Sequence, residues 1–210
     1  MASIVIFGGT GYAGGAIGAE AVRRGHSVTS VSPSGRPAPD GVMTVQGSIG
    51  DVALLDKLAA SADVWVVALR AVSGELGSAL PTVLDATARH DVRIGVVGGT
   101  GSLHVSEGGP RVVDLPDFPE AYKGEALAHA DVLAALRAAP PEVDWFYVSP
   151  AATFGAQSPG QATGTFRTSD DVLLTDADGN SYISGADFAT AFVNEIDSPA
   201  HSRQRFHVAY

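Results

Sequence analysis

The sequence predicts an α/β fold in which a doubly wound, mainly parallel sheet carries a small C-terminal cap. Two observations lead to this fold class. An apolar segment at residues 4–7 runs directly into glycines 8, 11 and 14, spaced G-x-x-G-x-x-G, and a helical pattern follows as far as about Gly25. Short apolar segments then alternate with helix-like segments up to about residue 150. Such β-α-β alternation is typical of parallel strands joined by right-handed crossovers, with helices on both faces of the sheet.

The strands expected after the first are short, and the one at 64–69 is apolar almost throughout, as in strands buried on both faces. The others are expected at 28–31, 42–45, 92–97 and 145–148. Helices are expected between them, at about 51–61, 75–90 and 120–138. The last of these begins near Pro119, and one face of it carries residues with helical spacing, namely Ala126, Ala130, Leu133 and Leu136.

The alternation weakens after Pro150. Residues 152–164 are rich in Gly, Pro, Gln, Ser and Thr, which predicts a loop. Short strands are expected near 172–174 and 182–184, then a helix at about 186–196 and a closing strand at 206–208. We therefore expect a single domain, 1–210, in which 151–210 caps the carboxyl edge of the sheet on the substrate side. Open α/β sheets bind ligands at that edge.

Composition excludes several classes of function. A net charge of −10 argues against a nucleic-acid partner, because no basic block is present to neutralise phosphates. With no cysteine, disulfides and thiolate chemistry are excluded. No signal-peptide pattern or membrane-length apolar run opens the chain, so we expect a cytoplasmic protein with no membrane contact. The histidines other than His129 lack metal-ligand spacing, and Asp176–Gly179 fits a turn better than a calcium loop, so no metal is expected.

The glycine-rich turn predicts a dinucleotide cofactor. Gly8 permits a backbone conformation that a Cβ would penalise, Gly11 permits close approach of a pyrophosphate, and Gly14 permits tight packing of helix on strand. Amides at the start of the helix then face the anion. The expected contacts in this turn are Gly8, Thr10, Gly11, Tyr12, Ala13 and Gly14.

The end of the second strand favours NADP(H) over NAD(H). No carboxylate occurs between Glu20 and Asp40 to bind the ribose hydroxyls, whereas Ser32, Ser34 and Arg36 could hold a 2′-phosphate. The alternative is that this segment is only a solvated turn. Further cofactor contacts are expected where the third and fourth strands end, from Ser48, Ile49, Ala68, Leu69 and Arg70. Arg70 could instead begin a helix with its charge in water.

Several segments along essentially the whole chain resemble one family. They are Gly8–Gly14, Val97–Leu103, Asp117–Lys123, Trp145–Ala152 and Arg203–Phe206. Together they are similar to the NAD(P)H-flavin reductases, a group near biliverdin-IXβ reductase/flavin reductase among the atypical short-chain dehydrogenases, with NmrA-like relatives. The resemblance implies a single NAD(P)-binding Rossmann domain that reduces flavins or other planar conjugated acceptors. It also places the nicotinamide at the ends of the fifth and sixth strands, beside Gly99, Thr100, Pro150 and Ala152.

The chain departs from the wider superfamily in its catalytic residues. Typical short-chain dehydrogenases place a tyrosine four residues before a lysine, but Lys57 and Lys123 are preceded at that spacing by Ala53 and Pro119. This absence favours flavin reduction over ketone reduction, because an oxidised flavin is an electron sink.

Three residues are candidates for catalysis: Ser102, Tyr122 and His129. Tyr122 and His129 are seven residues apart and so share a helix face. By the resemblance, His129 stands where the superfamily has its lysine. The reductases' second histidine is replaced here by alanine, at 151 and 152, which weakens any assignment to biliverdin.

These observations predict an NADPH-dependent oxidoreductase that transfers hydride to a flavin or a similar planar acceptor. The flavin is expected to be a substrate, not a bound prosthetic group. The alternatives are an NmrA-like protein that senses NADP(H) without catalysis, and a nucleotide-sugar epimerase or dehydratase. The last is disfavoured by the missing tyrosine–lysine pair and the short C-terminal region.

Overall fold

A single eight-stranded sheet organises the computed structural model, which describes residues 1–210. The strand order is β3-β2-β1-β4-β5-β6-β8-β7, and every neighbouring pair is parallel except β7 with β8. The strands are β1 (Ser3–Phe7), β2 (Ser27–Ser32), β3 (Met43–Gln46), β4 (Val64–Val67), β5 (Arg93–Val97), β6 (Trp145–Ser149), β7 (Arg167–Ser169) and β8 (Gln204–Ala209). The predicted doubly wound α/β fold is confirmed.

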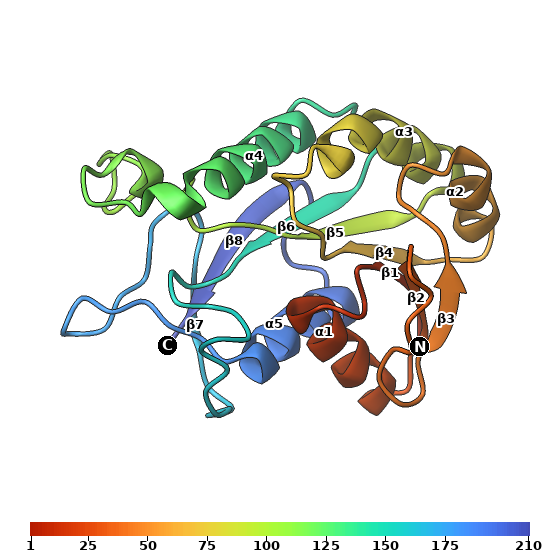
Figure 1. Cartoon of the computed structure of the whole chain (residues 1–210), viewed down its shortest axis with the longest axis horizontal. Helices are drawn as coiled ribbons and strands as arrows, with labels where there is room; N and C mark the ends of the chain where they lie inside the picture. The colour runs from red at the N-terminus through yellow and green to blue at the C-terminus, as the bar shows by residue number, and fades with distance from the viewer.

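Helices cover both faces of the sheet. Helices α2 (Val52–Ala59), α3 (Glu75–His90) and α4 (Glu120–Arg137) lie on one face, and α1 (Tyr12–Arg23) and α5 (Gly185–Asp197) lie on the other (Figure 1). A short 3-10 helix, Val112–Asp114, precedes α4. None of these helices combines the length and the apolar character that a membrane span requires.

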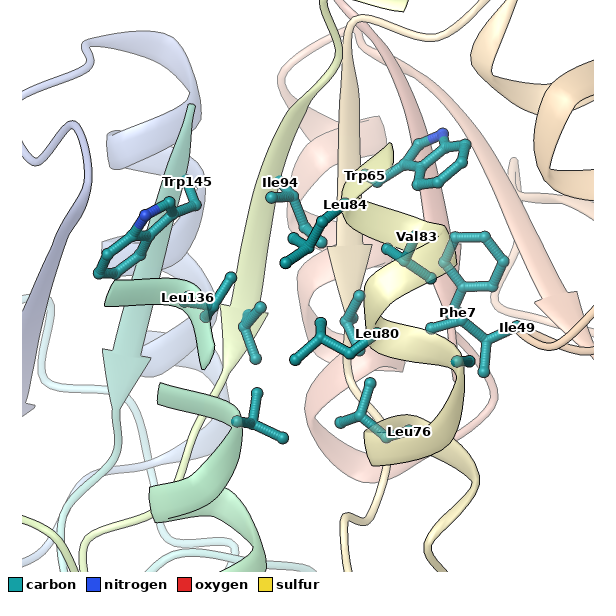
Figure 2. Close-up of a cluster of buried hydrophobic side chains, with 14 of the residues drawn as sticks. Phe7, Ile49, Trp65, Leu76, Leu80, Val83, Leu84, Ile94, Leu136 and Trp145 are labelled. Carbon is teal, nitrogen blue, oxygen red and sulfur yellow. The ribbon is translucent and has the colours of Figure 1, made fainter. Parts of the chain in front are cut away.

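Two hydrophobic cores result, one on each face. Along β1 the side chains alternate, so that Val5 and Phe7 enter the core under α2–α4 while Ile4 and Ile6 enter the core under α1 and α5. Trp65 packs edge-on against Phe7 in the first core, with ring centroids 5.4 Å apart (Figure 2). Because both faces are covered, the central strands are apolar on both sides, which is why the sequence shows near-continuous apolar runs.

The last sixty residues divide into two parts. Helix α5 packs along α1, and β8 pairs with β6 inside the sheet, so both are layers of the Rossmann fold itself. The irregular segments between β6 and α5 follow the carboxyl end of β6 and are joined to each other by the bridge between Thr153 and Tyr182. Of the last sixty residues, only these segments follow the carboxyl end of β6 outside the layers of the fold.

Two of the expected short strands are wrong. Residues 172–174 and 182–184 form only isolated bridges, and the strand β7 lies at Arg167–Ser169 instead. The apolar side chains near 172 suggested a strand, but they pack in a loop. In this loop the amide of Leu173 donates to the carbonyl of His104. Strand β7 is short and polar and lies at the sheet edge, so it lacks an apolar signal.

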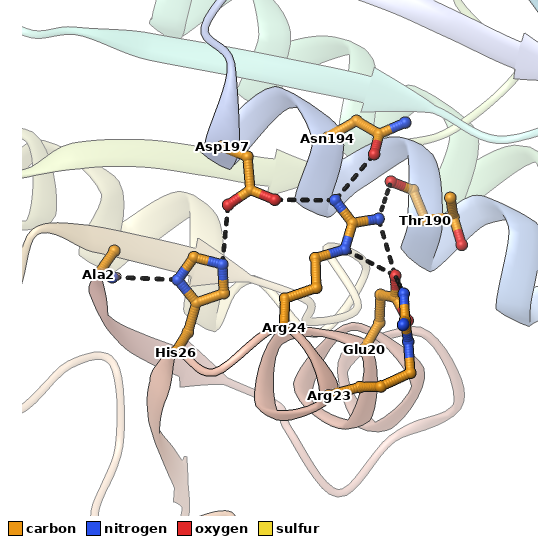
Figure 3. A network of polar contacts seen from close by, with 8 residues as sticks. All are labelled: Ala2, Glu20, Arg23, Arg24, His26, Thr190, Asn194 and Asp197. Carbon is orange, nitrogen blue, oxygen red and sulfur yellow. Dashed lines mark hydrogen bonds and ion pairs between the residues drawn. The ribbon is translucent and has the colours of Figure 1, made fainter.

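A polar network fastens α1 to α5 at the end remote from the glycine turn. The guanidinium of Arg24 donates to Glu20 on its own helix and to Asn194 and Asp197 on α5, at distances of 2.7–2.8 Å (Figure 3). The Nε2 atom of His26 lies 2.8 Å from the second oxygen of Asp197. These bonds fix the axis of α1, and therefore the direction in which its N-terminus points.

Candidate cofactor and acceptor site

The turn between β1 and α1 requires glycine at two positions. Gly8 has φ +90°, and a Cβ there would lie 2.4 Å from the carbonyl oxygen of Ala68 at the end of β4. A Cβ at Gly14 would lie 2.3 Å from the carbonyl oxygen of Gly8. Both distances are far inside van der Waals contact. The roles predicted for these glycines, a special backbone conformation and close helix packing, agree with this geometry.

Gly11 differs because its missing side chain faces open space. A Cβ there would meet only the carbonyl oxygen of Gly8, at 3.3 Å. Gly11 is also the N-cap of α1, with no capping side chain and no acidic residue in the first turn. The amides of Tyr12, Ala13 and Gly14 have no protein acceptor. This exposed, uncapped helix start is suited to an anion such as a pyrophosphate, and Thr10 lies exposed beside it.

The side chain of Tyr12 points away from this anion site. Its ring packs edge-on against Phe154, with centroids 5.3 Å apart, and its hydroxyl donates to the carbonyl of Pro159. Tyr12 therefore offers only its amide to an anion, while its ring supports the loop that follows β6.

A further glycine of the turn, Gly9, was missed by the sequence analysis. A Cβ at this position would lie 2.5 Å from the hydroxyl oxygen of Ser30, which is fully buried on β2. The doublet Gly8-Gly9 is the signal that could have shown it, but the partner on β2 is a long-range contact.

The residues proposed for the 2′-phosphate lie together after β2. Ser32 is buried and its hydroxyl has no hydrogen-bond partner in the protein. Gly35, with φ +59°, turns the chain, and Arg36 then donates from Nε to the hydroxyl of Ser34 at 3.2 Å. The guanidinium of Arg36 and the side chain of Ser34 are exposed, so this corner carries an accessible cation and one accessible hydroxyl, whereas the predicted contact Ser32 is buried.

The residues at the ends of β3 and β4 have differing environments. Ser48 donates to Glu75 and accepts from the amide of Gly50, so its hydroxyl is committed to the fold. Ile49 is a buried core residue. Ala68 and Leu69 lie against the position of a Cβ on Gly8, and Arg70 is exposed, with Nε 3.6 Å from the carboxylate of Glu125.

Hydrogen bonds join the ends of β5 and β6, where the nicotinamide is expected. The hydroxyl of Thr100 lies 2.9 Å from the carbonyl of Pro150, and the hydroxyl of Ser149 donates to the carbonyl of Gly99. The amide of Ala152 donates to the hydroxyl of Ser181. The four predicted residues Gly99, Thr100, Pro150 and Ala152 therefore belong to one connected edge.

The three catalytic candidates are not gathered at one point. Tyr122 is 62% exposed and His129 only 7%, although both lie on the same face of α4. Tyr122 is in the first turn of the helix, and the face that buries His129 leaves it in solvent. Ser102 accepts a hydrogen bond from Arg205 on β8, at 3.0 Å, and so faces a different part of the molecule.

A partner of His129 was missed by the sequence analysis. The carboxylate of Glu125 lies 3.1 Å from Nε2 of His129 and accepts the amides of Ala71 and Val72, at 2.8 and 3.1 Å. Burial by itself raises the pKa of Glu125, but these hydrogen bonds outweigh it and lower the pKa to about 2. The carboxylate is therefore ionised at neutral pH. Its contribution to the free energy of unfolding is lost as the pH falls from the ordinary glutamate pKa of 4.5 towards about 2.

This pair ties α4 to the loop that follows β4. Glu125 and His129 have the four-residue spacing of the tyrosine–lysine pair that the sequence analysis looked for, and that spacing could have signalled this pair. The Nδ1 atom of His129 is buried without a protein partner. No group of three or more potential metal ligands is found in the structure.

Substituting valine for Gly11 is expected to weaken nucleotide binding without unfolding the protein. The new side chain would occupy the space in front of the α1 amides, and losing those charge-assisted hydrogen bonds removes about 3 kcal/mol, or roughly two orders of magnitude in Kd for NADPH. Calorimetry measures this change. The control is Gly77→Val, because a Cβ at Gly77 meets nothing within 4 Å. Unchanged affinity in a folded Gly11→Val protein would contradict the site.

Substituting alanine for Glu125 is expected to release the loop after β4. A hydrogen bond to a charged group contributes about 1.5–3 kcal/mol, so amide exchange at Ala71 and Val72 should quicken by roughly ten- to a hundredfold. Hydrogen exchange followed by NMR measures it, with Glu120→Ala on the same helix as control, since Glu120 has only a 3.8 Å contact with Lys123. Equal protection of these two amides in both variants would contradict the role of Glu125 in holding the loop.

Comparison with known proteins agrees with this geometry. Residues 8–199 match the model of the NAD(P)H-binding family. YwnB of Bacillus subtilis (strain 168) is 36% identical, over 98% of this chain and 97% of that protein. A structure described as a proposed exported protein from Burkholderia pseudomallei is 38% identical over the full length of both chains, with a TM-score of 0.89. SP1627, a proposed NADH-flavin reductase from Streptococcus pneumoniae TIGR4, is 29% identical over 100% of this chain and 99% of that one, with a TM-score of 0.86. The chain thus belongs to the NAD(P)H-binding family.

Proposed function

We propose that this protein is an NADPH-dependent reductase that transfers hydride to a flavin or a similar planar conjugated acceptor. The observation that carries the proposal is the uncapped start of α1, where three amides without protein acceptors lie beside the open position of Gly11. That site is suited to the pyrophosphate of a nicotinamide dinucleotide. The likeness to SP1627 supports a flavin as the acceptor.

The preference for NADPH rests on the corner after β2. The exposed guanidinium of Arg36 and the exposed hydroxyl of Ser34, to which it is bonded, are donors of the kind that a dianionic phosphate requires. No carboxylate stands there to accept the hydroxyls of an unphosphorylated ribose.

The protein's part in the reaction is mainly positioning. When bound, the cofactor supplies the hydride, and the residues of this chain orient it against the acceptor. The linked ends of β5 and β6, held by Thr100 and Ser149, form a rigid edge for the nicotinamide. In this proposal the acceptor lies between that edge and the first turns of α4, where Tyr122 offers an exposed ring. A flavin needs no strong proton donor, which suits a site without the tyrosine–lysine pair.

The alternative of a non-catalytic NADP(H) sensor predicts the same cofactor site but no turnover. An epimerase or dehydratase acting on a nucleotide sugar is less well supported. The short segments between β6 and α5 leave little protein to hold a second nucleotide, and Lys123 is exposed and pairs only with Glu120.

Oxidation of NADPH with FMN, FAD or riboflavin is the experiment that tests the function. We expect turnover of the order of 1 s⁻¹ or faster, measured by the loss of absorbance of NADPH, and none in the Gly11→Val variant. If NADPH binds but no flavin, quinone or biliverdin is reduced, the protein is a sensor and the reductase proposal fails.

Replacing Arg36 with alanine tests the cofactor preference. Loss of a charged donor to the 2′-phosphate should raise the Kd for NADPH by roughly ten- to a hundredfold and leave that for NADH unchanged. Titration calorimetry with both cofactors measures the ratio, with Arg89→Ala, on the remote helix α3, as control. Equal effects on NADPH and NADH would exclude Arg36 from the phosphate site.

A further inference from the structure

A pocket lies between the C-terminal half of α4 and the loops beside β8. Its volume is about 520 Å³, within the range of small-molecule sites. Its polar lining consists of Ser102, His104, Arg111, Arg137 and Arg205, and three alanines and a leucine of the α4 segment form an apolar wall. None of the residues of the glycine turn, and none of the corner after β2, contributes to it.

The charge of this lining is opposite to that of the protein as a whole. The chain has 23 acidic and 13 basic residues, yet the pocket is lined by three arginines and a histidine and by no carboxylate. Two carboxylates outside the lining pair with these arginines. Asp114 binds Arg111, and a single oxygen of Asp171 is shared by Arg137 and Arg205. Three guanidiniums therefore face two carboxylates, which leaves one positive charge uncompensated at the pocket.

The arginine at the base of the pocket is held rigidly. The side chain of Arg205 is only 2% exposed and is fixed by Asp171 on one side and by the hydroxyl of Ser102 on the other. Burial lowers the pKa of Arg205, and the charge of Arg137 acts in the same direction. Burying a cation costs free energy unless negative charge compensates it, so this position favours an additional anion.

Donors remain free around this buried arginine. Arg137 uses only one of its terminal nitrogens, to bind Asp171, and the rest of its guanidinium has no protein acceptor. Arg111 bonds to Asp114 through Nε and one terminal nitrogen, leaving the other free. Ser102 accepts from Arg205, and no protein group accepts its own proton. These donors line one cavity and point to a single class of ligand.

We infer that this pocket is a binding site for a small organic anion, a phosphate or carboxylate carried on an apolar body, separate from the cofactor turn. The anionic group would bind to Arg137, Arg111 and the hydroxyl of Ser102, and its apolar body would lie along α4. Arginine is suited to either anion because its planar guanidinium binds both with two hydrogen bonds. The inference does not depend on the reductase activity, since none of its residues is assigned to hydride transfer by the geometry.

NMR titration of the folded protein with phenyl phosphate and with benzoate tests the site. We expect saturable shifts at the amide of Ser102 and at the side-chain Nε of Arg137 and Arg205, and none with neutral benzyl alcohol. Tighter binding of phenyl phosphate assigns the pocket to phosphates, and tighter binding of benzoate assigns it to carboxylates. Shifts confined to the glycine turn and Arg36, or no saturable shift in the pocket, would overturn the inference.

A matched pair of variants separates the site from a general charge effect. Arg137 and Arg89 both lie near the C-terminus of a helix, are 50% and 45% exposed and are paired with aspartates. Arg137→Gln should weaken binding at least tenfold, whereas Arg89→Gln should leave it unchanged. Arg111→Gln provides a second test at the pocket if Arg137→Gln does not fold. Equal weakening by the pocket and control variants contradicts the assignment.

Discussion

Three backbone segments approach one another so closely at the end of β1 that two positions of the turn admit only glycine. The carbonyl of Ala68 after β4 and the carbonyl of Gly8 itself occupy the space that side chains at Gly8 and Gly14 would need. Since no other residue type fits there, the start of α1 is drawn down onto the sheet, and its amides emerge at the carboxyl edge beside β4. The position of these amides is therefore decided by steric exclusion.

The rest of the fold keeps that arrangement rigid. Helix α1 is joined to α5 by Arg24, and α5 leads along the chain to β8, which pairs with β6. On the opposite face, Glu125 joins α4 to the loop after β4. Elements on both faces of the sheet are thus cross-linked by ionised groups that are partly shielded from water.

Local sequence patterns were sufficient to predict the strands and helices that form the layers of the fold. They were insufficient to predict most side-chain contacts. The bounds of α3 were predicted at both ends, because apolar periodicity and flanking strands are local signals. The glycine turn was predicted with the backbone conformation of Gly8. By contrast, the contact between Ser102 and Arg205 joins residues 103 positions apart, and nothing near either of them in the sequence indicates it. The spacing of Glu125 and His129 is a local signal, but the amides of Ala71 and Val72, which Glu125 accepts, are 54 and 53 positions away. Which residues hold the cofactor stays a prediction.

Tyr12 connects the start of α1 to the segment that follows β6. Its amide belongs to the first turn of α1, while its ring lies under the segment containing Phe154 and Pro159. Tyr12 therefore belongs both to the start of α1 and to the packing of the segment that follows β6. Because an aromatic ring is rigid, this single side chain sets the spacing between the start of α1 and the segment that follows β6.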